Sequence, residues 1–159
     1  MTSRWARLIS SGLAAGAVIS VGEWAAHYVW LARAWTDAFA ALGKTPTSWA
    51  LFIPVNFCVG ILLVWGYRWL SDRYGHGPRT ALRTGLTAWI IFWVIPTLTM
   101  QPLNIFPNRL LGLTILVGLA QGVLASVLGA WLYEGMRWPP AVVATTGAFR
   151  HSGRRQGIQ

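Results

Sequence analysis

Four long apolar runs constrain this sequence more than any other feature. They cover residues 8–31, 48–70, 80–100 and 110–134. Each exceeds the roughly 20 residues that a helix needs to cross a hydrocarbon core about 30 Å thick. The runs lack the strict alternation of barrel strands, and a helix satisfies its own backbone groups within lipid. The sequence therefore predicts an all-α, polytopic membrane protein whose four transmembrane helices form an antiparallel bundle.

The composition agrees with a membrane protein. Hydrophobic residues make up 55% of the chain and charged residues only 11%, whereas charged residues reach about 25% in soluble domains. The net charge is +9, but the basic residues lie between and beyond the apolar runs. The predicted partner of these residues is therefore a surface of anionic lipid head groups at the cytoplasmic face, and no nucleic acid is expected.

The distribution of basic residues predicts the orientation of the spans. One side carries ten of them: Arg4, Arg7, Arg68, Arg73, Arg79, Arg83, Arg137, Arg150, Arg154 and Arg155. The other side carries Arg33, Lys44 and Arg109. The positive-inside rule therefore places both termini in the cytoplasm. Residues 1–138 are predicted to form the transmembrane domain, and residues 139–159 a basic cytoplasmic tail.

The first apolar run follows two arginines, as a signal peptide would. It is longer than the apolar core of a signal peptide, it contains Glu23 and His27, and it has no small-residue cleavage site. We therefore expect it to be retained as the first span.

Small residues at steps of four predict where the spans touch. Lipid tails are as apolar as leucine, so close approach at small side chains must hold membrane helices together. Two strips follow this spacing: Gly12, Gly16 and Ser20 in the first span, and Gly118, Gly122, Ser126 and Ala130 in the fourth. Residues four apart share a helix face. The two strips are predicted to meet each other as the tightest contact, unless one of them faces a second protein.

Short internal similarities suggest a further level of organisation. Residues 12–15 resemble residues 85–88, and residues 65–68 resemble residues 131–134. Each pair lies at the same edge of matching spans. The chain could therefore consist of two helix hairpins related by an axis along the membrane normal.

The connections between the spans carry their own signals. Residues 36–44 have Thr36 as a possible cap and Gly43 as a stop, with Trp35, Phe39 and Leu42 on one face. This pattern predicts a short helix in the outer interface, and an irregular loop is the alternative. In the second connection, residues 75–78 form a turn in which Pro78 suits the first turn of the next helix.

Eleven tryptophans stand out in the composition. Most lie near the ends of the spans, as the aromatic belts of membrane proteins do. Trp24, Trp89 and Trp93 fall within spans instead. Each of these three must either find a hydrogen-bond acceptor for its N–H group or face lipid.

Polar residues gather at one depth of the predicted bundle. Glu23 lies about 12 Å below the outer end of the first span, and Asn56 in the second span is nearly level with it. Gln121 in the fourth span is slightly deeper. Glu23 and His27 are four residues apart and can pair directly. The sequence predicts a polar layer in the outer half of the membrane.

Two prolines are predicted to disturb the helices in the same half. Pro54 and Pro96 lie in the outer parts of the second and third spans. Each lacks a backbone donor and frees a carbonyl in the preceding turn.

Three interpretations of the polar layer stay open. In the first, Glu23, His27, Asn56 and Gln121 form an interhelical clamp, because intramembrane acids face the bundle and find partners. In the second, Glu23 carries a proton or anchors the polar group of a small ligand. In the third, His27 is an axial ligand to haem or a chlorophyll-type pigment, although no haem-attachment motif occurs.

Other chemistry is not indicated. His76 and His151 lie too far from His27 in the predicted topology to complete a metal site. No phosphate-binding loop, nucleophile elbow or zinc-protease motif occurs. The sequence predicts no metal, no cofactor and no enzymatic activity.

Three stretches carry a resemblance to a known group. They are residues 21–23, 77–85 and 129–134. Through them the whole chain resembles a family of small bacterial four-span membrane proteins of unassigned activity. In that family an asparagine commonly precedes the acid of the first span, whereas this chain has Ser20 near Glu23. The resemblance implies four helices in a bacterial inner membrane and supplies no substrate.

These observations predict a small membrane protein that acts by association. It would form a self-associated bundle or serve as an accessory subunit of a larger membrane assembly. The alternative is a protein that handles a small solute, a lipid or protons at the Glu23 and His27 site. Haem or pigment binding through His27 is the third hypothesis.

Overall fold

The computed structural model of this protein describes residues 2–45 and 48–138, and these are helical apart from short connections. The α-helices are α1 (Thr2–Trp24), α2 (Ala32–Ala41), α3 (Phe52–Tyr74), α4 (Pro78–Trp89), α5 (Ile95–Met100) and α6 (Asn108–Tyr133). Two π-helical segments, η1 (Ala25–Trp30) and η3 (Ile90–Val94), and two 3₁₀ turns, η2 (Trp49–Leu51) and η4 (Gln101–Leu103), complete the order. The basic tail predicted for residues 139–159 lies outside the described residues.

Four helical segments are long and apolar enough to cross a membrane. They are Ser3–Trp30, Phe52–Tyr74, Pro78–Leu103 and Asn108–Tyr133. The prediction of an all-helical protein with four helices that are long and apolar enough to span a membrane is therefore confirmed. The second segment lies about one helical turn later in the chain than expected, because residues 49–51 form the separate turn η2.

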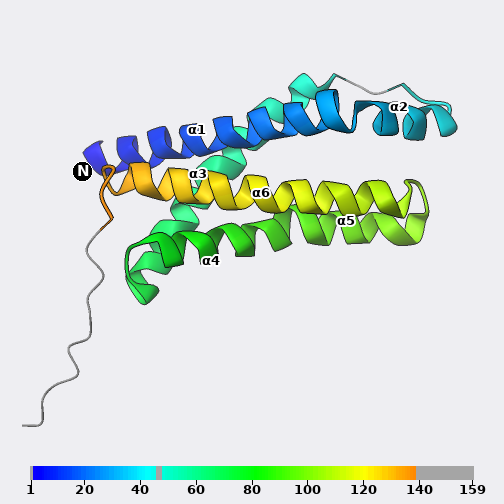
Figure 1. The fold of residues 1–159 in the computed structure, drawn as a ribbon. Helices are drawn as coiled ribbons and strands as arrows, with labels where there is room; N and C mark the ends of the chain where they lie inside the picture. Colours follow the sequence, from blue (N-terminus) through cyan, green and yellow to red (C-terminus); the bar gives the residue numbers. More distant parts are fainter. Residues whose placement is uncertain (1, 46–47, 139–159) are drawn as a thin grey trace, which may run out of the picture.

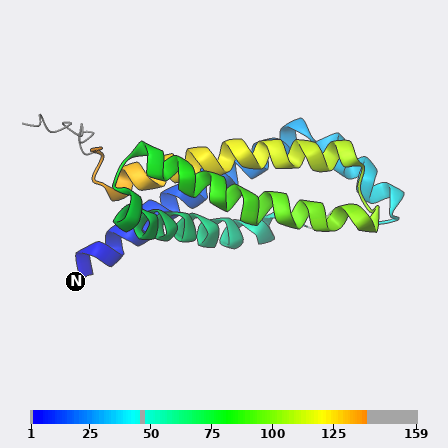
Figure 2. The same ribbon diagram turned by 90° about the horizontal axis from the view of Figure 1, so that it is seen from below.

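The segments form one layer with a crossing helix. Figure 1 shows α1, α6 and the rod made of α4, η3 and α5 side by side, while α3 crosses behind them at an angle. The view from below in Figure 2 also shows α3 on one side of that layer. The N-terminus, the α3–α4 connection and the last described residues lie at one end of the molecule, and α2 lies at the other (Figure 1).

The closest helix contact is between α1 and α3. A Cβ added to Gly60 of α3 would meet the backbone of Gly12 and Gly16 in α1, and one added to Gly16 would meet the Cα of Phe57 at 2.7 Å. The backbones of the two helices therefore touch directly. Gly12 and Gly16 are packing residues as predicted, but their partner is α3, so the expected contact between the two small-residue strips is wrong.

The strip on α6 packs against the third span. Gly118 faces the indole ring of Trp93, and Gly122 lies next to the backbone of Gly85. Ser126 donates a hydrogen bond to the carbonyl oxygen of Ala81 at 2.7 Å. Ala130 is buried in the same region, against Ala81. This pairing was not predicted, because small residues at steps of four indicate that a helix packs closely against another helix but do not identify the partner.

The two closest helix pairs are therefore α1 with α3 and α4 with α6. The first span is thus paired with the second and the third with the fourth, while an axis relating two such hairpins stays a prediction. The two pairs contact each other through α1 against α6 and, less extensively, through α3 against α6 and α4. A Cβ on Gly129 of α6 would meet the side chains of Ala15 in α1 and Val64 in α3.

The short helix predicted before the second span is present as α2. It begins at Ala32, earlier than expected, and Thr36 bonds back to the Ala32 carbonyl instead of capping the helix. Gly43 ends it with a φ of 66°. Trp35 and Phe39 pack against Phe106 in the α5–α6 connection, with ring centroids 5.2 and 5.6 Å apart. Trp35 and Phe39 are thus partly covered by protein, whereas Leu42, predicted on the same face, is 41% exposed.

Only one of the two prolines disturbs a span. Pro96 is the second residue after η3, and its missing N–H and its ring prevent an ordinary α-helical bond to the carbonyl of residue 92, which lies in η3. The widened turn accommodates this. Pro54 lies in the first turn of α3, where backbone N–H groups have no partner within the helix. The disturbance expected at Pro54 is therefore absent.

The contact at Gly60 predicts a sensitive position. We expect Gly60→Ala to lower the free energy of unfolding by about 1–3 kcal/mol, because the added methyl group meets backbone atoms that cannot move aside. Unfolding in a fixed detergent, followed by circular dichroism, measures this. Gly112→Ala is the matched control, since nothing lies within 4 Å of its Cβ. Equal stability of the two variants would contradict the close contact.

Candidate functional site

Glu23 in α1 is the centre of a polar cluster within the membrane span. Its Oε2 lies 3.0 Å from Nδ1 of His27, and its Oε1 accepts a hydrogen bond from Nε1 of Trp93 at 3.2 Å. Nδ1 of His27 is also 3.0 Å from the backbone oxygen of Glu23. Because a backbone oxygen can only accept, Nδ1 carries the hydrogen and donates it toward Glu23.

Both donors lie on π-helical segments. His27 belongs to η1 and Trp93 to η3. Single π-helical turns inside α-helices occur frequently at functional sites. Gly118 of α6 leaves the space that the Trp93 ring fills, because a Cβ there would collide with the ring. Three spans therefore cooperate to direct two donors at one carboxylate.

A pocket of about 310 Å³ opens next to this carboxylate, between α1 and the start of α3. Its polar lining comes from Ser20, Glu23, Asn56 and Tyr28, and its apolar lining from Trp24, Ala50, Phe52 and Ile53. Small-molecule sites have this character, a mainly apolar cavity with a few convergent polar groups.

Two of the polar groups have unused hydrogen-bonding capacity. The Ser20 hydroxyl is buried without a hydrogen-bond partner in the described part of the chain. The side-chain amide of Asn56 makes no hydrogen bond within residues 2–45 and 48–138 either, although Asn56 is only 8% exposed. Buried polar groups are normally paired. These two can pair with a molecule in the pocket.

Gln121 does not belong to this pocket. Its side chain lies on Gly22, on the contact between α1 and α6. It is 5% exposed, and neither its oxygen nor its nitrogen has a hydrogen-bond partner among the described residues. It lines a separate, largely apolar groove between α1 and α6.

The structure therefore divides the predicted polar layer. Glu23 and His27 pair directly as expected, and Asn56 lies beside them at the pocket. Gln121 is at a similar depth but on another side of α1, because depth along a span does not fix the direction of a side chain. Ser20, predicted to pack against another helix, lines the pocket instead. His27 packs its ring against Trp35 at 5.4 Å, and its role as a haem or pigment ligand stays a prediction.

The three tryptophans within the spans find the two environments expected of them. Trp93 bonds to Glu23, and Trp89 donates to the Ile115 carbonyl oxygen at 2.8 Å. Trp24 is 59% exposed on the surface that would face lipid. The sequence did not identify Trp93 as the partner of Glu23. The only indication in the sequence was that Trp93 lies within a span, at a predicted depth similar to that of Glu23.

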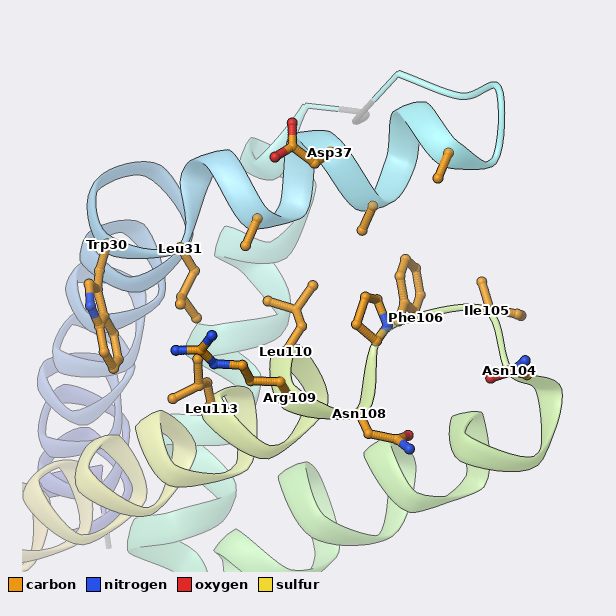
Figure 3. A pocket seen from close by; sticks show the side chains of 14 residues that line it. Trp30, Leu31, Asp37, Asn104, Ile105, Phe106, Asn108, Arg109, Leu110 and Leu113 are labelled. Carbon is orange, nitrogen blue, oxygen red and sulfur yellow. The ribbon is translucent and has the colours of Figure 1, made fainter.

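A larger pocket, of about 830 Å³, lies at the end of the molecule that holds α2. Figure 3 shows it between α2 and the connection that leads into α6. Leu31, Phe106 and Leu110 form its apolar walls, Arg109 extends toward Leu31, and Asp37 points away from it (Figure 3). The polar lining residues Asp37, Asn104, Asn108 and Arg109 lie on different sides of this pocket (Figure 3). The polar groups of the Glu23 pocket lie closer together, so that pocket is the better candidate site.

Metal binding has no support in the described residues, where no three His, Cys, Asp or Glu side chains gather. No family model, curated protein or solved structure matches this chain. The resemblance to small bacterial four-span proteins stays a prediction.

The hydrogen bond between Trp93 and Glu23 predicts energetic coupling. In a double-mutant cycle, Trp93→Phe and Glu23→Gln should show a coupling free energy of about 0.5–1.5 kcal/mol for unfolding, the range found for hydrogen bonds between membrane helices. Detergent unfolding of the four variants supplies the values.

Trp65→Phe is the control for this cycle, because Trp65 is exposed on α3 and has no bond to Glu23. Its coupling to Glu23→Gln should be near zero. Additive effects for Trp93 as well would contradict the bond.

Proposed function

We propose that this chain is a multi-pass protein of a bacterial inner membrane, with four antiparallel spans and both termini in the cytoplasm. The proposal is supported by the charge distribution, in which arginines cluster at both ends of the chain and around the connection between α3 and α4. It is also supported by Figure 1, where the N-terminus, the α3–α4 connection and the last described residues lie at the same end of the molecule. Anionic lipid head groups would contact that end.

We propose further that the protein acts by binding a small amphipathic molecule in the pocket between α1 and α3. The observation that carries this proposal is the convergence of Ser20, Glu23 and Asn56 in an otherwise apolar pocket. The Ser20 hydroxyl and the Asn56 amide have no hydrogen-bond partner among the described residues. An interhelical clamp would use both groups for contacts between helices, so their free state favours a ligand site.

The lining suggests the chemistry of the ligand. The carboxylate of Glu23 is the strongest acceptor in the pocket and is 24% exposed, so it remains reachable after bonding His27 and Trp93. A hydroxyl or amine group on the ligand can donate to it. Trp24, Phe52 and Ile53 offer apolar surface to the remainder of the ligand. The proposed ligand is therefore a lipid-soluble alcohol or amine taken from the outer half of the membrane.

Asn56→Leu tests the ligand site. We expect the wild-type protein, purified in mild detergent from its native membrane, to retain one small-molecule adduct in native mass spectrometry. Asn56→Leu keeps the side-chain size and removes both hydrogen-bonding atoms, which should reduce retention about tenfold.

Gln121→Leu is the matched control, since Gln121 is a buried amide outside the pocket. It should retain the adduct. A wild-type protein without any adduct, or equal loss in both variants, would refute the proposed site.

Association with a second copy of the chain is the second candidate function. It is favoured by Gln121, whose amide lacks a partner beside an apolar groove of about 510 Å³ formed by α1 and α6. Small residues such as Gly22, Ala25 and Ala120 line this groove and allow close approach of another helix. A carboxamide offers both a donor and an acceptor, so two copies of Gln121 could pair across a two-fold axis if each side chain turned from Gly22 toward the groove.

Gln121→Leu also tests association. We expect the wild-type protein to form dimers in mild detergent, measured by sedimentation, and Gln121→Leu to dissociate at protein concentrations about five- to tenfold higher. Asn56→Leu should leave the dimer unchanged. A wild-type monomer at all concentrations would exclude this candidate.

A further inference from the structure

The end of the molecule opposite the Glu23 pocket holds a second, strongly charged pocket. It has a volume of about 320 Å³, and its lining is mainly polar. Arg4 and Arg7 reach it from α1, and Arg68 and Asp72 reach it from α3. His76 and Glu134 complete its wall. Arg68 lies more than 60 residues from Arg4 and Arg7 in the sequence, so the fold brings it to the two arginines of α1.

One acid of this pocket is already engaged by the protein. Oε1 of Glu134 accepts a hydrogen bond from the Tyr67 hydroxyl at 3.1 Å and lies 2.7 Å from Nδ1 of His76. The Tyr67 hydroxyl accepts one from the backbone N–H of Gly77 at 3.0 Å, and Tyr67 is fully buried. These bonds join α3, the α3–α4 turn and the end of α6 into a fixed wall.

The three arginines have no such partners. Within residues 2–45 and 48–138, none of them forms an ion pair with a carboxylate, and none makes a side-chain hydrogen bond. Asp72 lines the same pocket but lies beyond ion-pair distance of all three. Their hydrogen-bond donors are available to a bound molecule.

The packing of the helices holds these like charges together. Arg7 lies little more than one helical turn before Gly12, and Arg68 lies about two turns after Gly60. Direct backbone contact between Gly12 and Gly60 therefore fixes how far apart the arginines can be. Like charges on neighbouring helices repel one another, and the carboxylates of Asp72 and Glu134 in the same lining offset only part of the charge of the three arginines. A bound anion would reduce the remaining repulsion.

We propose that this pocket binds a phosphate group through Arg4, Arg7 and Arg68. Arginine presents a planar set of donors that fits phosphate oxygens in pairs, and such charge-assisted bonds are stronger than neutral ones. The phosphate can belong to a lipid head group or to a soluble phosphate ester. This site is separate from the pocket proposed above for a lipid-soluble alcohol or amine.

Two binding measurements distinguish the sources of the phosphate. The first is calorimetric titration of the full-length protein in an uncharged detergent with inorganic phosphate, at constant ionic strength set with chloride. The second is native mass spectrometry of the protein in micelles that contain phosphatidic acid and phosphatidylcholine in equal amounts. Binding of inorganic phosphate indicates a soluble ligand, and preferential retention of phosphatidic acid alone indicates a lipid.

Arg7→Gln and Arg68→Gln should each weaken the binding about tenfold or more in whichever measurement detects it. Arg79→Gln is the control, since it removes one positive charge at the same end of the molecule but outside the pocket. It should change the binding less than twofold.

The stability of the unliganded variants provides a further check. Removing one of several like charges should leave the melting temperature of Arg68→Gln equal to or above that of the wild type. A purely structural role for Arg68 predicts a lower melting temperature instead. Absence of binding in both measurements, or equal weakening by Arg79→Gln, would overturn the proposed phosphate site.

Discussion

The hydrogen bonds to the carboxylate of Glu23 are the interactions on which the half of this protein next to α2 depends. A charged carboxylate at the centre of a span costs roughly 2.5–3.5 kcal/mol on insertion scales. Here His27 and Trp93 both direct an N–H group toward it. Each donor lies on a π-helical segment, and Gly118 on α6 leaves the room that Trp93 requires. The shapes of three spans are therefore adapted to one acid.

A second constraint links the two ends of the molecule. Gly60 allows α3 to touch the backbone of α1, and this contact fixes the relative position of the two helices. On one side of it, Ser20 and Glu23 face Asn56 across a pocket. On the other side, the arginines of α1 meet Arg68. The close contact between α1 and α3 therefore positions both candidate sites. Neither site lies at the larger pocket next to α2.

The sequence predicted the spans well because their signal is local. Length and hydropathy are sufficient to identify a membrane helix, and depth counting correctly set Glu23 near Asn56. The choice of neighbours depends on rotation and crossing angle, which a single sequence does not record. The close contact of Gly60 with α1 was not predicted, because Gly60 has no second small residue four positions away in α3. The network of Tyr67, His76 and Glu134 was missed for a similar reason, because its members are brought together only by the fold.

The helix irregularities were predictable to different extents. Pro96 was visible in the sequence and adjoins the π-helical segment η3. The segment η1, which carries His27, has no proline or glycine to announce it. Its widened turn allows the histidine ring to reach the Glu23 carboxylate while packing on Trp35. No residue type within the segment marks this turn, so the sequence alone did not predict it.

The indole N–H resonances test the central role of Glu23 most directly. In a proton–nitrogen correlation spectrum of the labelled protein in micelles, Glu23→Gln should shift the Trp93 Nε1–H signal, assigned by its loss in Trp93→Phe, because a neutral amide oxygen is a weaker acceptor than a carboxylate. The Trp89 signal should stay in place, since its acceptor is the backbone oxygen of Ile115. An unchanged Trp93 signal, or an equal shift of both, would contradict the bond that organises this half of the protein.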